Sequence, residues 1–236
     1  MDTGSYAIII AAFLLAYLTF GDGFRRTYRW YNKKFVYPKR LEYINRYRFG
    51  SAPKDKMREL HPRLTTSETD QAFEGLRQFF LIAHAAQGEV VMPSRAVDDA
   101  WHQFILFTDD YSRFCERAFG KFFHHKPYAK NVDNGETATV VPASLKTWAI
   151  ACHLEGISYE QPEKLPLLFS IDADLEIDNG NVNTLDSEQI GFYTSAARQY
   201  RKQGRGGVND GDPSASVLWF CGGDIGGGGS CVGGGN

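Results

Sequence analysis

An uncharged, apolar run close to the start of the chain is the feature that most constrains its fold. Residues 3–21 carry no charged side chain, and Tyr6 to Phe20 are apolar or aromatic apart from Thr19. As a helix rising about 1.5 Å per residue, this run spans about 28 Å, close to the hydrocarbon thickness of a bilayer. We therefore expect residues 1–23 to form a single transmembrane anchor.

The residues after this run predict its orientation. Aromatic and cationic side chains alternate there, as is typical of the headgroup layer, where rings sit at the interface and long cations reach the phosphates. On the other side, only Asp2 and the amino terminus are charged, so the positive-inside rule predicts an external N-terminus and a cytoplasmic body. The predicted lipid-facing residues are Arg25, Arg26, Arg29, Trp30, Lys33 and Lys34.

A cleaved signal peptide is the main alternative to the anchor. Such a peptide has a basic start, a shorter apolar stretch and a small-x-small cleavage site. The start of this chain is not basic, and no such site follows the apolar run. A buried core helix is the other alternative. The sequence favours the anchor over both.

The remaining chain is expected to be mainly α-helical. Its 43% hydrophobic and 14% aromatic content is enough for a packed core. We expect a juxtamembrane segment and connector over residues 24–62, a compact helical domain over 63–203 and a flexible glycine-rich tail over 204–236. Apolar residues at helical spacing predict helices at about 41–49, 67–87, 94–108, 110–119, 143–154 and 187–202.

Several helix ends carry recognisable signals. Ser67 with Asp70 three residues later predicts a capping box, and Ser94 predicts a second N-cap. Gly120 and Gly156 follow apolar helical runs and predict C-terminal stops. Residues 51–62 are expected to be a connector, and the acidic residues between 172 and 178 a solvated loop rather than a Ca²⁺ site.

Charge and cysteine content restrict the class of protein. The formal net charge of −2 gives no field that favours nucleic acid, and the basic residues cluster beside the apolar run, where anionic lipid is the better partner. The four cysteines, Cys115, Cys152, Cys221 and Cys231, are too scattered for a disulfide framework. This usage fits a reducing compartment.

One dense segment holds the candidate chemistry. Asp98 and His102 are four residues apart on a predicted helix and so share a face. A turn near residue 109 folds the next helix back, which brings Cys115 toward them, and a further turn at Gly120 returns His125, with His124 beside it. Aspartate, histidine and thiolate are Zn²⁺ ligands, so Asp98, His102, Cys115 and His125, with His124 in reserve, form a candidate zinc site.

Two other interpretations of the segment remain open. Asp98 can orient His102 through a hydrogen bond with no metal, and Cys115 can be an ordinary buried residue of an apolar helix face. Alternatively, a histidine beside Cys115 can stabilise a catalytic thiolate. The spacing is less diagnostic than a CxxC pair, and it does not decide among the three.

The segment resembles the bacterial glycine-rich domain-containing proteins and, more distantly, the plant proteins of that name. The resemblance covers about residues 65–180 and the Cys-Gly-Gly tail. It implies that one site is formed by Asp98, Trp101, His102, Tyr111, Cys115, His124 and His125. Because the resembling proteins are bacterial, the predicted anchor places this chain in the bacterial inner membrane. The motif consists of the site residues together with Phe114 and Gly120.

Three hypotheses for function follow. The first is a membrane-tethered accessory or assembly protein that binds a protein partner or a larger membrane complex through its helical domain and tail. The second is a zinc-dependent enzyme that uses the Asp/His/Cys/His site, and the third is a module that binds anionic lipid. Because a glycine-rich tail gains order only against a partner, the sequence favours the first, non-enzymatic hypothesis.

Overall fold

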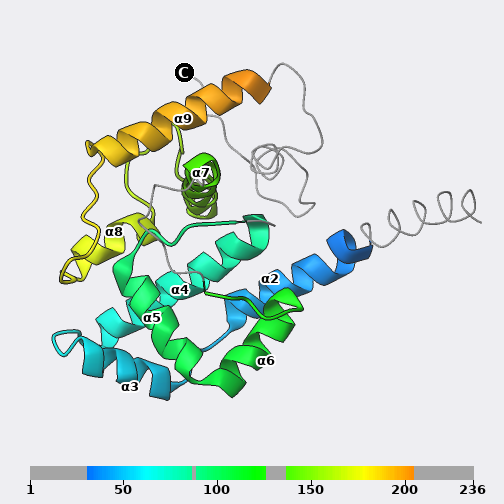
Figure 1. The fold of residues 1–236 in the computed structure, drawn as a ribbon, viewed down its shortest axis with the longest axis vertical. Coiled ribbons are helices and arrows are strands. Elements are labelled where there is room, and N and C mark those ends of the chain that lie inside the picture. Colours follow the sequence, from blue (N-terminus) through cyan, green and yellow to red (C-terminus); the bar gives the residue numbers. More distant parts are fainter. Residues whose placement is uncertain (1–30, 87–88, 126–136, 205–236) are drawn as a thin grey trace, which may run out of the picture. The chain divides into compact units, whose positions relative to one another are not determined.

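The computed structural model describes residues 31–86, 89–125 and 137–204, and within these ranges the chain is helical without a β-strand (Figure 1). This confirms the mainly α prediction. In chain order, the elements are η1 (Asn32–Val36, a π-helix), α2 (Tyr37–Arg46), α3 (Ser51–Leu60), α4 (Thr66–Ala86), α5 (Arg95–Leu106), α6 (Thr108–Phe119), α7 (Thr137–Leu154), α8 (Leu167–Asp174) and α9 (Glu188–Gly204).

No helix within those ranges has the length and apolar character needed to cross a bilayer. The predicted anchor, residues 1–23, lies outside the described residues, as do residues 205–236 of the predicted tail. The chain divides into two compact units. Unit 1 comprises residues 1–47 and 112–123, and unit 2 comprises residues 48–111 and 124–236.

In unit 1, one face of α2 packs on the second half of α6. The ring of Tyr47 lies 4.6 Å from that of Phe114, between centroids, and Tyr43 contacts the same phenylalanine. Burial raises the pKa of Tyr43, and the nearby Arg117 guanidinium opposes this shift. These ring contacts stabilise the pairing of two short helices that have few apolar residues of their own.

Gly120 ends α6 as predicted. Its φ is +73°, in the left-handed region that favours glycine. The guanidinium of Arg40 lies beside this glycine. Nη1 of the same arginine donates a hydrogen bond to the carbonyl of Phe119 at 2.9 Å, so the guanidinium occupies the space above the helix end.

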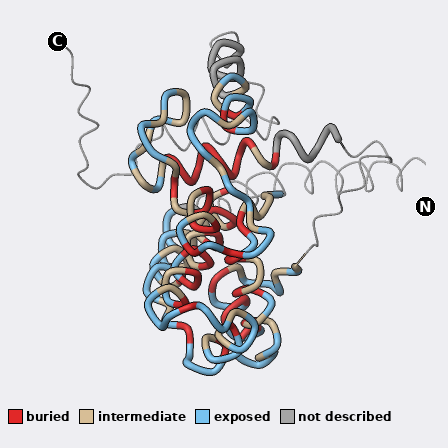
Figure 2. The backbone as a smooth tube through the Cα atoms, turned by 90° about the vertical axis from the view of Figure 1, so that its left-hand side faces the viewer, coloured by how far each residue is buried: buried red, intermediate tan, exposed pale blue. Residues whose placement is uncertain are grey.

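In unit 2, α4 is the central helix and packs against α3, α5, α7 and α8. Figure 2 shows buried and exposed positions alternating along the helices, as expected when each buries one stripe. Gly75 allows α5 to approach closely, because a Cβ there would lie 2.6 Å from Cγ2 of Val97. The buried stripe of α4 consists of Ala72, Phe73, Leu76, Phe79, Phe80, Ile82 and Ala83.

A buried carboxylate, Asp172, fixes the start of α5. Only 2% of this residue is exposed, and it accepts four hydrogen bonds. Ser94 Oγ donates at 2.6 Å, and the backbone N–H groups of Arg95, Ala96 and Asn181 donate at 2.7, 2.9 and 2.8 Å. An anion placed at a helix N-terminus satisfies N–H groups that have no partner within the helix.

The prediction of a solvated acidic loop was therefore wrong at Asp172. This residue ends up buried because the loop after α8 folds back over it, and Gly180 lies so close that a Cβ there would be 2.9 Å from Cβ of Asp172. The neighbouring Asp174, Glu176 and Asp178 are exposed, as predicted.

The predicted connector over residues 51–62 was also wrong, since α3 occupies most of it. Two buried residues on one face, Pro53 and Met57, give this short polar helix its packing surface. On its exposed side, Lys56 pairs with Glu59 three residues later. Tertiary burial therefore overrides a sequence that has little apolar periodicity.

The capping box of α4 lies two residues earlier than predicted. Thr65 N donates to the Glu68 carboxylate at 2.7 Å, and Glu68 N donates to Thr65 Oγ1 at 3.2 Å. Hydrogen bonds to the Glu68 carboxylate from the backbone N–H of Thr65, the larger cause, and from the Thr65 side chain lower the pKa of Glu68. The cap at Ser94 is confirmed, because its hydroxyl accepts from Val97 N at 3.1 Å, and Gly156, at φ +67°, follows the end of α7.

We predict that Asp172→Asn destabilises the protein by about 3 kcal/mol, because an amide nitrogen would face at least one of the four donors. Urea unfolding of the purified full chain measures the change. The matched control is Asp174→Asn, two residues away and exposed, which should shift the midpoint little. Equal shifts for the two variants would contradict the role assigned to Asp172.

Candidate functional site

Helix α5 carries two of the predicted ligands on one face. Asp98 lies in its first turn and His102 one turn later, and His102 Nδ1 is 3.5 Å from Asp98 Oδ2. The Asp98 side chain is 34% exposed and that of His102 is 49% exposed. The predicted sharing of a face is confirmed, and the face is accessible to solvent.

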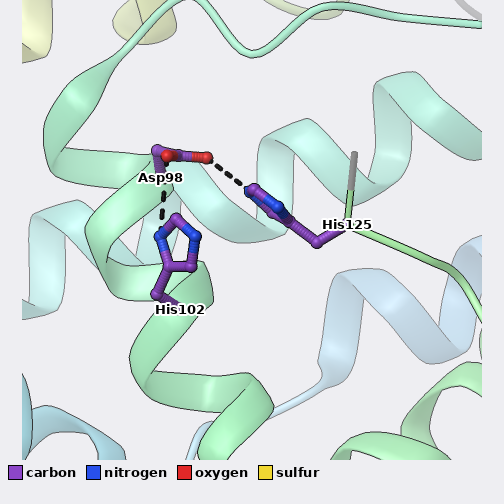
Figure 3. Close-up of side chains that lie close together, drawn as sticks. All are labelled: Asp98, His102 and His125. Carbon is purple, nitrogen blue, oxygen red and sulfur yellow. Dashed lines mark hydrogen bonds and ion pairs between the residues drawn. The ribbon is translucent and has the colours of Figure 1, made fainter. Parts of the chain in front are cut away.

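The third residue of the group comes from the segment that follows Gly120. His125 Nε2 lies 2.8 Å from Asp98 Oδ1, within hydrogen-bonding distance, and the side chain is 12% exposed. Figure 3 shows the Asp98 carboxylate facing both imidazoles, with each oxygen directed to a different ring. The ring centroids of His102 and His125 are 4.3 Å apart.

Trp101 supports the site from the core side. Its ring is edge-on to the ring of His125, with centroids 4.4 Å apart. Its indole N–H donates to the Tyr111 hydroxyl at 3.1 Å, and Phe79 and Phe80 contact it from α4. The tryptophan therefore links the position of His125 to the packed interior of unit 2.

The other two predicted ligands lie elsewhere in the chain's organisation. Cys115 is part of unit 1, where it is fully buried, and Phe114 beside it packs on Tyr43 and Tyr47. His124 is exposed. The structure therefore brings together Asp98, His102 and His125 out of the predicted Asp/His/Cys/His set.

Sequence reasoning missed a second aspartate–histidine pair beside the first. His61 Nε2 lies 3.0 Å from Asp99 Oδ2, and both side chains are 17% exposed. Arg95 Nε is 3.8 Å from the same carboxylate oxygen. The pair joins the end of α3 to α5. The sequence offered one signal for it, the Asp98–Asp99 doublet. His61 was missed because it is 38 residues away and lay in a predicted connector.

Comparison with known proteins assigns the chain to a family. The family model described as UCP032817-like matches residues 39–203, which is well over half of the chain. The chain belongs to the UCP032817-like family. No curated protein and no solved structure matches it. The match includes every residue of the site, so the site is part of the region that defines membership.

The donor set fits a divalent metal. Two imidazole nitrogens and one carboxylate oxygen lie within 4.8 Å of one another. In a tetrahedral zinc site, with bonds of about 2.0–2.2 Å, ligand atoms are about 3.3 Å apart, so a modest contraction would suffice. The same donor types also suit Fe²⁺, which two histidines and one carboxylate commonly hold.

The buried thiol of Cys152, unlike the three residues of the site, is poorly suited to bind a metal. Cys152 lies on α7 with no exposed surface. Desolvation is the larger cause, and the Glu155 carboxylate the smaller, of a strong rise in its pKa. A thiol that resists ionisation is a poor nucleophile and a poor metal ligand, so Cys152 acts as a core residue.

We predict that Cys152 in the folded chain reacts very slowly with iodoacetamide. Because its folded pKa lies above its unfolded value, this thiol contributes stability that is present below the unfolded pKa and declines as the pH rises above about 9. Mass spectrometry of its tryptic peptide, before and after unfolding in urea, measures the difference. Rapid labelling of the native protein would contradict this assignment.

Proposed function

We propose that unit 2 is a divalent-metal-binding domain, with Zn²⁺ as its first candidate ion. The observation that carries the proposal is the convergence of Asp98, His102 and His125 on a solvent-accessible face of α5. All three are ligand types that zinc accepts.

Three protein ligands leave a coordination position for water or another molecule, as in catalytic rather than structural zinc sites. When bound there, the ion would supply Lewis-acid chemistry and a more acidic water molecule. The chain's own residues supply the binding. Asp98 orients both imidazoles, and Trp101 holds the ring of His125 against the core.

An arrangement without metal is the competing interpretation, because a hydrogen bond between Asp98 and His125 already satisfies one carboxylate oxygen. The two interpretations differ in the role of His102, which is half exposed and 3.5 Å from Asp98. In a polar network His102 contributes little, whereas as a ligand it is essential.

We predict that the purified chain binds about one equivalent of Zn²⁺. His102→Ala and His125→Ala should each weaken binding at least tenfold, because even the loss of a residue that only orients a ligand costs about tenfold or more. Isothermal titration after chelation measures affinity, and Co²⁺ substitution reports the ligand field. His124→Ala tests whether the adjacent histidine takes part, and His153→Ala, on α7, is the matched control.

Two results would contradict this proposal. One is the absence of saturable binding in the parent chain. The other is unchanged affinity in His102→Ala and His125→Ala, which would place any bound metal elsewhere.

We propose a membrane-tethered accessory role as the second candidate, in a bacterial inner membrane and with residues 1–23 as the anchor. Apolar side chains on the surface of unit 2 support it: Val182 is 71% exposed, Leu185 41% and Phe192 44%. The first two precede α9 and Phe192 lies on it, and we propose that they belong to one protein-binding surface. The resemblance to bacterial glycine-rich domain-containing proteins remains part of the same proposal.

For this role we predict that partner proteins co-purify with the parent chain in mild detergent. They should be lost from the triple variant Val182→Ser, Leu185→Ser and Phe192→Ser. Quantitative mass spectrometry of the eluates provides the comparison. Leu106→Ser, which alters a 66% exposed leucine on α5, serves as the control. Identical partner sets for all three proteins would remove the case for this surface.

A further inference from the structure

An exposed aromatic and cationic cluster lies on η1, at the beginning of the described part of unit 1. Tyr31 is 52% exposed and Phe35 41% exposed, and their ring centroids are 5.4 Å apart. The ammonium of Lys34 lies 5.7 Å from the centroid of the Phe35 ring. Two aromatic rings and a cation therefore share one side of the chain, and both rings are partly open to solvent.

The cluster continues into the first turn of α2. Pro38 and Lys39 are exposed, and they lie three and four residues after Phe35, which is one helical turn. We call Tyr31, Lys34, Phe35, Pro38 and Lys39 the outer stripe. It contains two cations and no anion.

Other positions of α2 show that the outer stripe is distinct from the packed face. Arg40, Tyr43 and Tyr47 are the residues that contact the second half of α6. Burial also raises the pKa of Tyr37 to about 12, and this half-buried side chain is less open to solvent than Tyr31 and Phe35. The residues that hold unit 1 together are therefore different residues from those of the outer stripe.

Rings interleaved with lysines have a specific physical preference. Aromatic side chains favour the headgroup layer of a bilayer, where one edge is apolar and the other hydrated. Lysines extend to lipid phosphates and are attracted by anionic leaflets. A soluble acidic protein would also complement the positive charge of the two lysines, but binding it would not require two partly exposed rings beside them.

The chain that precedes the stripe has the same composition. Residues 24–30 are Phe-Arg-Arg-Thr-Tyr-Arg-Trp, so the pattern of rings and cations in the stripe extends one already present in the sequence. We infer that the outer stripe is a docking surface for an anionic membrane, and that it holds unit 1 against the headgroups. This inference is independent of the metal site in unit 2.

Lysine footprinting of the full chain in lipid nanodiscs tests the inference. Discs of phosphatidylcholine, with and without phosphatidylglycerol, are treated with an acetylating reagent, and labelling rates are read by mass spectrometry. We expect Lys34 and Lys39 to be labelled about fivefold more slowly in the anionic discs, since a basic residue near such a surface gains about 1 kcal/mol. The protection should disappear at high salt.

Lys56, half exposed on α3 in unit 2, is the internal reference, and its labelling rate should be the same in both discs. The double variant Tyr31→Ser and Phe35→Ser should lose the protection. The matched control is Phe122→Ser, which alters another exposed ring of unit 1 outside the stripe and should retain it.

Three outcomes would overturn the inference: equal labelling of Lys34 and Lys39 in the two discs, full protection in the Tyr31/Phe35 variant, or failure of the chain to associate with anionic bilayers. Zn²⁺ titration of the Tyr31/Phe35 variant separates this test from the proposed function. Its affinity should equal that of the parent chain, whatever the footprinting shows.

Discussion

The buried carboxylate of Asp172 is the interaction on which unit 2 depends. Its Oδ1 accepts hydrogen bonds from the Ser94 hydroxyl and the N–H of Ala96, and its Oδ2 accepts from the N–H groups of Arg95 and Asn181. This one side chain from α8 thereby accepts the hydrogen bonds that N–H groups at the start of α5 would otherwise donate to water. The direction of α5 follows from this contact, and with it the direction of the face that carries Asp98 and His102.

The sequence was most informative where a signal is local. The spacing of apolar residues predicts the helices between residues 66 and 119. Ser94 predicts a helix start because its hydroxyl can cap, and Gly120 predicts a helix end because glycine adopts a positive φ easily. The Asp98–His102 pair belongs to the same class, because four residues on a helix fix two side chains on one face.

The failures arose where long-range contacts decide. The burial of Asp172 depends on Ser94, which is 78 residues away, and helix α3 depends on a packing partner for Met57 that no local pattern reveals. Cys115 is a different case. It is buried in unit 1, as expected for an ordinary residue of an apolar helix face, and its place beside the histidines stays a prediction.

The close approach of α4 and α5 at Gly75 has a mechanical consequence for the candidate site. Because there is no spare volume between Gly75 and Val97, and because Asp172 holds the end of α5, this helix has little freedom to shift. His125, in contrast, comes from a non-helical segment. Any tightening of the three donors would therefore require rotation of the half-exposed His102 side chain, or movement of the His125 segment against the ring of Trp101.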